Sequence, residues 1–145
     1  MSLTAESGVE PPPLGAMIKT PAAAFSAAAI AEHSDFISVG TDDLTQYTLA
    51  TDRENQLVSR YYQKDHKSIM KMLKIIAEQI SPMRVVVCGE LASREPAIPK
   101  LLQAGVQTLS AVAPLIPVVK ETIRNTYAVP RRVNGTRSGL SRELK

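Results

Sequence analysis

Three consecutive valines constrain the fold of this chain more than any other feature of its sequence. Val85, Val86 and Val87 lead directly into Cys88 and Gly89. An unbroken apolar run of this kind is typical of a parallel strand that helices bury on both sides. Parallel neighbours need long crossover connections, which are usually helices. We therefore expect an α/β protein.

The rest of the chain repeats this strand and helix pattern. Between residues 65 and 80, apolar side chains recur at intervals of three and four, which predicts a helix with one apolar face. Further strands are expected at 16–18, 35–39 and 106–112, and further helices at 21–33, 95–103 and 117–127. The polar cluster at 41–43 is expected to be a loop. Four such strand–helix units form either an open sheet or half of an eight-stranded barrel.

Length and composition limit what the chain can be. At 145 residues it has room for one domain. We expect a flexible segment at 1–13, which ends in three prolines, a folded domain at 14–127, and a basic tail at 128–145. The single cysteine excludes an internal disulfide and has no zinc-site spacing. With neither a membrane-spanning run nor a signal peptide, we expect a cytoplasmic protein that does not bind a membrane.

The net charge of +3 raises the question of nucleic-acid binding. The basic excess belongs to the tail, which has four arginines and one lysine against one glutamate from residue 128 onward. This tail has no aromatic side chains for stacking on bases and no known nucleic-acid module. We therefore expect no nucleic acid as a partner.

The carboxyl ends of parallel strands carry the ligand site in both candidate architectures. Here these ends hold Lys19, the segment 40–44 with Asp42 and Asp43, Cys88, and the segment 110–114. Taken alone, each has an ordinary reading: the two aspartates as turn or cap residues, and Cys88 as a buried inert thiol. Arg53, nine residues after the segment 40–44, would by itself be read as a solvated surface charge.

Three sequence blocks together resemble a known family. GAMIKTPAAA, DFISVGTDDLTQYTLATDREN and VVVCGELA follow one another in this order. They resemble the carboxyl-terminal barrel of enzyme I of the bacterial sugar phosphotransferase system and, more distantly, pyruvate phosphate dikinase. The resemblance covers about residues 14–127. It implies the carboxyl-terminal half of a TIM-type (β/α)8 barrel from a family that transfers the phosphoryl group of phosphoenolpyruvate to a protein histidine, with magnesium as cofactor.

The resemblance also implies a role for each matching residue. Asp43 matches the aspartate that binds magnesium, whereas Lys19 replaces the second expected carboxylate ligand, which argues against normal metal binding. Asp42 stands where the family has an asparagine that contacts the substrate phosphate. Arg53 matches the arginine that binds the phosphoryl group, for which a guanidinium fork is suited. Cys88 matches the thiol that exchanges a proton with the substrate carbon.

Two readings of function follow from this resemblance. In the first, the chain is a fragment or truncated homologue of the phosphoenolpyruvate-binding domain, inactive alone because the family's other substrate-binding arginines and its phosphorylated histidine lie on segments that this sequence does not contain. In the second, it is a non-catalytic binding or assembly module that pairs with itself or with a partner chain. The family dimerises through this domain, and four strands would leave open edges, so we expect a homodimer.

Overall fold

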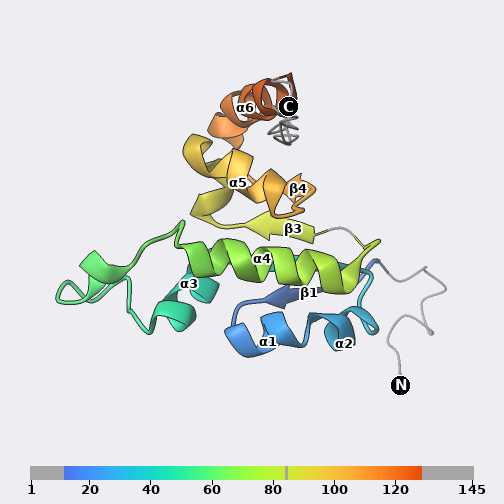
Figure 1. The fold of residues 1–145 in the computed structure, drawn as a ribbon, viewed down its shortest axis with the longest axis horizontal. Coiled ribbons are helices and arrows are strands. Elements are labelled where there is room, and N and C mark those ends of the chain that lie inside the picture. The colour runs from blue at the N-terminus through green and yellow to red at the C-terminus, as the bar shows by residue number, and fades with distance from the viewer. Residues whose placement is uncertain (1–11, 84, 129–145) are drawn as a thin grey trace, which may run out of the picture.

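The computed structural model describes residues 12–83 and 85–128 (Figure 1). Four strands alternate with helices along the chain. The strands are β1 (Gly15–Ile18), β2 (Phe36–Gly40), β3 (Val85–Cys88) and β4 (Thr108–Leu109). The α-helices are α1 (Pro21–Phe25), α2 (Ala27–Ala31), α3 (Thr41–Leu49), α4 (Lys67–Ile80), α5 (Ile98–Gln103) and α6 (Ile116–Ala128). Short 3-10 turns η1 (Ser59–Tyr61), η2 (Glu90–Ser93), η3 (Glu95–Ala97) and η4 (Ala113–Leu115) complete the described part.

The strands form one sheet in the order β1-β2-β3-β4, and every neighbouring pair is parallel. Each strand therefore lies beside the next strand along the chain, as in consecutive units of an α/β barrel. Parallel pairing also brings all four carboxyl ends to one edge of the sheet. The α/β prediction is confirmed, and this sheet is consistent with part of a barrel.

Helices cover one face of the sheet and build the core on it. Ile18, Ile37, Val39, Val85 and Val87 alternate along their strands and are almost completely buried. The long helix α4 crosses this side of the sheet with α1 and α2 beside it (Figure 1). Its apolar side chains pack into the same core: Ile69, Met72, Leu73, Ile76 and Ile80.

The opposite face of the sheet is not covered by any described element. One row of paired residues runs across it, consisting of Met17, Ser38, Val86 and Thr108. Met17 keeps 51% of its surface exposed. Two residues earlier on the same face, Gly15 pairs with Phe36. The Phe36 ring lies over this glycine, where an added Cβ would clash with the ring. In a closed barrel such a face would line the interior.

The structure corrects the prediction of a loop at 41–43. These residues form the first turn of α3, whose amino end follows Gly40 with no intervening loop. Asp42 and Asp43 therefore occupy a helix amino terminus, where negative side chains interact favourably with the helix dipole. The consequence is that both carboxylates are held on a helix and not on a loop.

Two other boundaries differ from the sequence prediction. The helix expected at 21–33 breaks at Ser26 into α1 and α2, and Ser26 donates its backbone N–H to two carbonyls of α1. The strand expected at 106–112 pairs only at Thr108–Leu109. The flexible segment predicted at 1–13 and the basic tail predicted at 128–145 lie outside the described residues, apart from 12–13 and residue 128. Within the described part, no helix is both long enough and apolar enough to cross a membrane.

Candidate functional site

The pairing register aligns three site positions along the carboxyl edge of the sheet. Ile18 pairs with Val39, so Lys19 follows beside Gly40, and Gly40 pairs in turn with Cys88. The stem of Lys19 lies beside this glycine, since a Cβ at Gly40 would be in ordinary contact with Cγ of Lys19, at 3.4 Å. The aliphatic stem of Lys19 therefore crosses the end of β2 toward α3.

Lys19 and Arg53 converge on the carboxylate of Asp43. Lys19 Nζ lies 3.0 Å from Oδ2, and Arg53 Nη1 lies 3.8 Å from Oδ1. The three side chains come from the end of β1, from the loop after α3 and from the first turn of α3. All three remain partly exposed, with Asp43 at 32%, Arg53 at 40% and Lys19 at 52%. The cluster can therefore be reached from solvent and offers nitrogen donors that Asp43 does not use.

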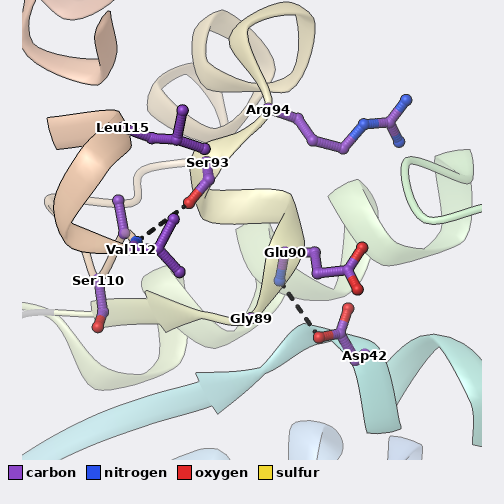
Figure 2. A pocket seen from close by; sticks show the side chains of 9 residues that line it. Asp42, Gly89, Glu90, Ser93, Arg94, Ser110, Val112 and Leu115 are labelled. Carbon is purple, nitrogen blue, oxygen red and sulfur yellow. Dashed lines mark hydrogen bonds between the residues drawn. The ribbon is translucent and has the colours of Figure 1, made fainter. Parts of the chain in front are cut away.

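Asp42, the next residue in the same turn, is turned toward a different strand end. Its Oδ2 accepts a hydrogen bond from the backbone N–H of Glu90, at 3.2 Å, just beyond β3 (Figure 2). Gly89 makes this approach possible, because it has a φ of +103° and an added Cβ would come within 2.8 Å of Asp42 Oδ2. The side chain of Glu90 pairs with Lys64. Asp42 therefore fastens α3 to the end of β3.

Tyr62 holds the same turn from the outer side. Its hydroxyl donates to the backbone carbonyl of Asp42 at 2.9 Å. Burial raises the pKa of the Tyr62 phenol above its ordinary value, and the negative charge of Asp42 raises it further, while Arg53 acts in the opposite direction. Tyr62 is therefore protonated at neutral pH and available as this donor.

Cys88 lies half-buried at the last position of β3. Its Sγ is 3.3 Å from the carbonyl oxygen of Val39, to which the thiol donates, and 3.4 Å from Oγ of Ser38. The backbone carbonyl of Cys88 accepts a hydrogen bond of 2.9 Å from Thr41 Oγ1. These contacts fix the thiol at the carboxyl edge and connect it to the amino end of α3.

A cavity of about 560 Å³ opens beside this edge, between the ends of β3 and β4. Figure 2 shows Ser93, Ser110, Val112 and Leu115 around it, with the carboxylates of Asp42 and Glu90 at one end. Its wall combines apolar side chains with the polar side chains of Asp42, Glu90, Ser93, Arg94 and Ser110, so it could hold a small polar organic ligand. Asp42 lines it, as do Ser110, Ala111 and Val112 of the predicted strand end 110–114, whereas Lys19, Asp43, Arg53 and Cys88 are not among its lining residues.

The residues at this edge do not fit a magnesium ion. Mg²⁺ requires oxygen ligands at about 2.0–2.1 Å in near-octahedral geometry. Both oxygens of Asp43 face cationic nitrogens, from Lys19 and Arg53. In the part of the chain that the structure describes, no group of three or more His, Cys, Asp or Glu side chains gathers to hold a metal ion. Among the described residues, the carboxylate that the resemblance assigns to magnesium is thus paired with two cations, and a lysine stands where the second carboxylate is expected.

The structure thus places all five predicted site residues in two adjoining groups. Lys19, Asp43 and Arg53 form one, and Asp42 and Cys88 belong to the connection between α3 and β3. Sequence reasoning missed the supporting contacts of Thr41, Tyr62, Lys64 and Ser93. Thr41 could have been found from its place at a strand end, whereas nothing in the sequence marks Tyr62 or Lys64.

Comparisons with known proteins show the family to which the chain is related. The family model described as "PEP-utilising enzyme, PEP-binding domain" matches residues 3–128. The chain is 42% identical over 114 residues to the phosphoenolpyruvate-protein phosphotransferase of Haemophilus influenzae. This alignment covers 77% of this chain and 20% of that protein. The chain is also 36% identical over 127 residues to the probable phosphoenolpyruvate synthase of Methanocaldococcus jannaschii, covering 83% of this chain and 11% of that protein.

The chain therefore spans a fifth or less of the length of these curated relatives. The family match, over residues 3–128, includes all four strands of the sheet and every residue of the candidate site. The relatives are named for phosphoenolpyruvate in both cases, although they belong to two kinds of enzyme. By its sequence match over residues 3–128, this chain belongs to the family of PEP-utilising enzymes, within the part described as their PEP-binding domain.

Proposed function

We propose that this chain forms the carboxyl-terminal half of a phosphoenolpyruvate-binding (β/α)8 barrel of the phosphotransferase type. The observation that carries the proposal is the convergence of Lys19 and Arg53 on Asp43 at the carboxyl edge of a parallel sheet. Ligand sites of α/β barrels lie at this edge. Phosphoenolpyruvate carries a phosphate and a carboxylate, and both groups accept hydrogen bonds from lysine and arginine.

In this proposal each side chain has a separate task. Arg53 binds the phosphoryl oxygens, and Lys19 neutralises part of the ligand's negative charge. When the bond between phosphorus and the bridging oxygen breaks, the phosphoryl group passes to an acceptor and the enolate of pyruvate remains. The Cys88 thiol then gives its proton to the methylene carbon of the enolate and becomes a thiolate. Asp42 positions α3 against the strand end through Glu90.

We propose further that the chain binds phosphoenolpyruvate weakly and does not transfer its phosphoryl group when it is alone. Transfer needs an acceptor, and neither histidine of the chain is suited to that role. His66 caps α4, with Nδ1 accepting the backbone N–H of Ser68 at 3.2 Å. His33 lies in the connection between α2 and β2, at the edge of the sheet opposite to the carboxyl edge.

Calorimetric titration of the purified chain with phosphoenolpyruvate tests the binding. We expect millimolar affinity, reduced about tenfold or more in Arg53→Ala because one charge-assisted contact is lost. Arg60→Ala is the matched control, since the Arg60 guanidinium stacks on Tyr61 at 4.8 Å and takes no part in the cluster. Equal affinity of both variants would contradict the assignment of Arg53. Pyruvate release by the chain alone would contradict the proposed inactivity.

A second function has support from the uncovered face of the sheet. An assembly module would pair this face, and the open edges of β1 and β4, with a second copy of the chain. Around a two-fold axis along the barrel, β4 of one copy would lie parallel to β1 of the other. Sedimentation at micromolar concentration tests this candidate: we expect a dimer that Met17→Lys weakens and that Leu57→Lys, a change on an exposed loop, leaves intact. A monomeric wild type would exclude it.

A further inference from the structure

We propose that Lys19 takes the place of a divalent cation, so that this site binds its anionic ligand without magnesium. The inference rests on the proposed function and concerns the chemistry of the same site. A metal ion in a phosphate site neutralises negative charge and holds oxygens in place. The ammonium of Lys19 provides a positive charge at this position as part of the protein itself.

The contacts of Asp43 carry the first step. This carboxylate is the residue that a metal would use, and Lys19 Nζ lies 3.0 Å from its Oδ2. Arg53 approaches the other oxygen at 3.8 Å. A metal ion bound to Asp43 would have to displace the ammonium and would then lie beside two like charges, which is unfavourable.

The position of Lys19 in the sheet carries the second step. Lys19 leaves the end of β1 next to Gly40, and its stem lies within ordinary contact distance of that residue, since a Cβ added at Gly40 would be 3.4 Å from its Cγ. The stem crosses the end of β2, and the ammonium reaches the first turn of α3, where it pairs with Asp43. The ion pair with Asp43 thus holds the positive charge at the carboxyl edge of the sheet.

The remaining donors carry the third step. Lysine has three N–H donors and arginine has five, and each makes one contact with Asp43. The other carboxylate of this turn, Asp42, is turned away to the backbone N–H of Glu90. An incoming phosphate or carboxylate can therefore meet two cations on the side that Asp42 does not occupy.

The test compares ligand binding with and without the metal. Calorimetric titrations with phosphoenolpyruvate are run in EDTA and in excess Mg²⁺, and Mg²⁺ alone is titrated in parallel. For the wild type we expect affinities that agree within about twofold and no heat of Mg²⁺ binding. Lys19→Met should bind phosphoenolpyruvate about tenfold more weakly in EDTA. Lys19→Glu should bind Mg²⁺ and should need it for phosphoenolpyruvate binding.

Lys74→Glu is the control for the same change of charge, since Lys74 pairs with Glu78 on α4 and lies outside the cluster. It should behave as the wild type in every titration. A wild-type affinity that Mg²⁺ raises tenfold or more, or unchanged binding by Lys19→Met, would overturn the inference while the proposed function stands. An absence of phosphoenolpyruvate binding in both media would overturn the proposed function together with the inference.

Discussion

Replacing Gly89 by alanine should damage both the fold and the site, by an amount that can be worked out from the structure. Gly89 has a φ of +103° and a ψ of 178°, a region that is open essentially only to glycine and costs other residues roughly 1–3 kcal/mol. The added Cβ would also come within 2.8 Å of Asp42 Oδ2 and of Thr41 Oγ1. Asp42 must then move away from Glu90.

The expected loss has two parts. Backbone strain contributes about 1–3 kcal/mol, and losing the hydrogen bond from the Glu90 N–H to the charged Asp42 contributes about 1.5–3 kcal/mol. Gly105→Ala is the matched control. Gly105 also has a positive φ, of +92°, but its added Cβ would meet only Ala77, at 3.0 Å. The control should show the strain without the second part.

A double-mutant cycle with Asp42→Ala separates these two parts. Urea unfolding followed by circular dichroism gives the free energy of unfolding of each variant. In the Asp42→Ala background, Gly89→Ala should cost about 1.5 kcal/mol less than in the wild type, because the hydrogen bond is already gone. Gly105→Ala should cost the same in both backgrounds, within about 0.5 kcal/mol. Additive costs for Gly89→Ala and Asp42→Ala would refute the proposed link between the glycine and the aspartate.

Two further predictions concern stability away from the site. Leu73→Ala, which empties a fully buried position of α4, should lower the free energy of unfolding by about 2–5 kcal/mol in urea titrations, and a loss below 1 kcal/mol would contradict the assigned core. The hydrogen bond from Lys100 lowers the pKa of Asp65 in the folded protein. The pair therefore stabilises the fold at pH values above the ordinary carboxyl pKa, and this stabilisation is lost as the pH falls through the lowered pKa of the folded state. Because the pair is partly exposed, Asp65→Asn should cost no more than about 1 kcal/mol at pH 7 and nothing near pH 2, and an equal cost at both pH values would refute the assignment.

Strong local patterns made the strands and the longest helix predictable from the sequence. The three valines and the apolar spacing of residues 65–80 each describe a surface that has to be buried, and the structure buries Val85, Val87 and the apolar face of α4. Val86 is only partly buried, because no described element covers its face of the sheet. Helix α3 was missed because it has no comparable pattern. It is polar, it starts directly after Gly40, and its two aspartates equally favour a turn. Tertiary contacts from Tyr62 and Cys88 hold its first turn in place.

The site was predictable to the extent that strand ends define it. Lys19, Asp42, Asp43 and Cys88 all follow directly from the rule that ligands bind at the carboxyl edge of a parallel sheet. Their partners were not predictable in the same way. The meeting of Arg53 with Asp43 depends on the path of the loop after α3, and that path depends on contacts between residues far apart in the sequence.

The uncovered row on the sheet also determines which partner could cover it. Met17, Ser38, Val86 and Thr108 alternate between apolar and hydroxyl side chains across the four strands. The Ser38 hydroxyl already lies 3.4 Å from Sγ of Cys88, whereas an apolar surface that covered the exposed Thr108 would remove its hydroxyl from solvent, at a cost of about 1–3 kcal/mol. The row therefore favours a partner surface that is apolar opposite Met17 and Val86 and offers an acceptor opposite Thr108.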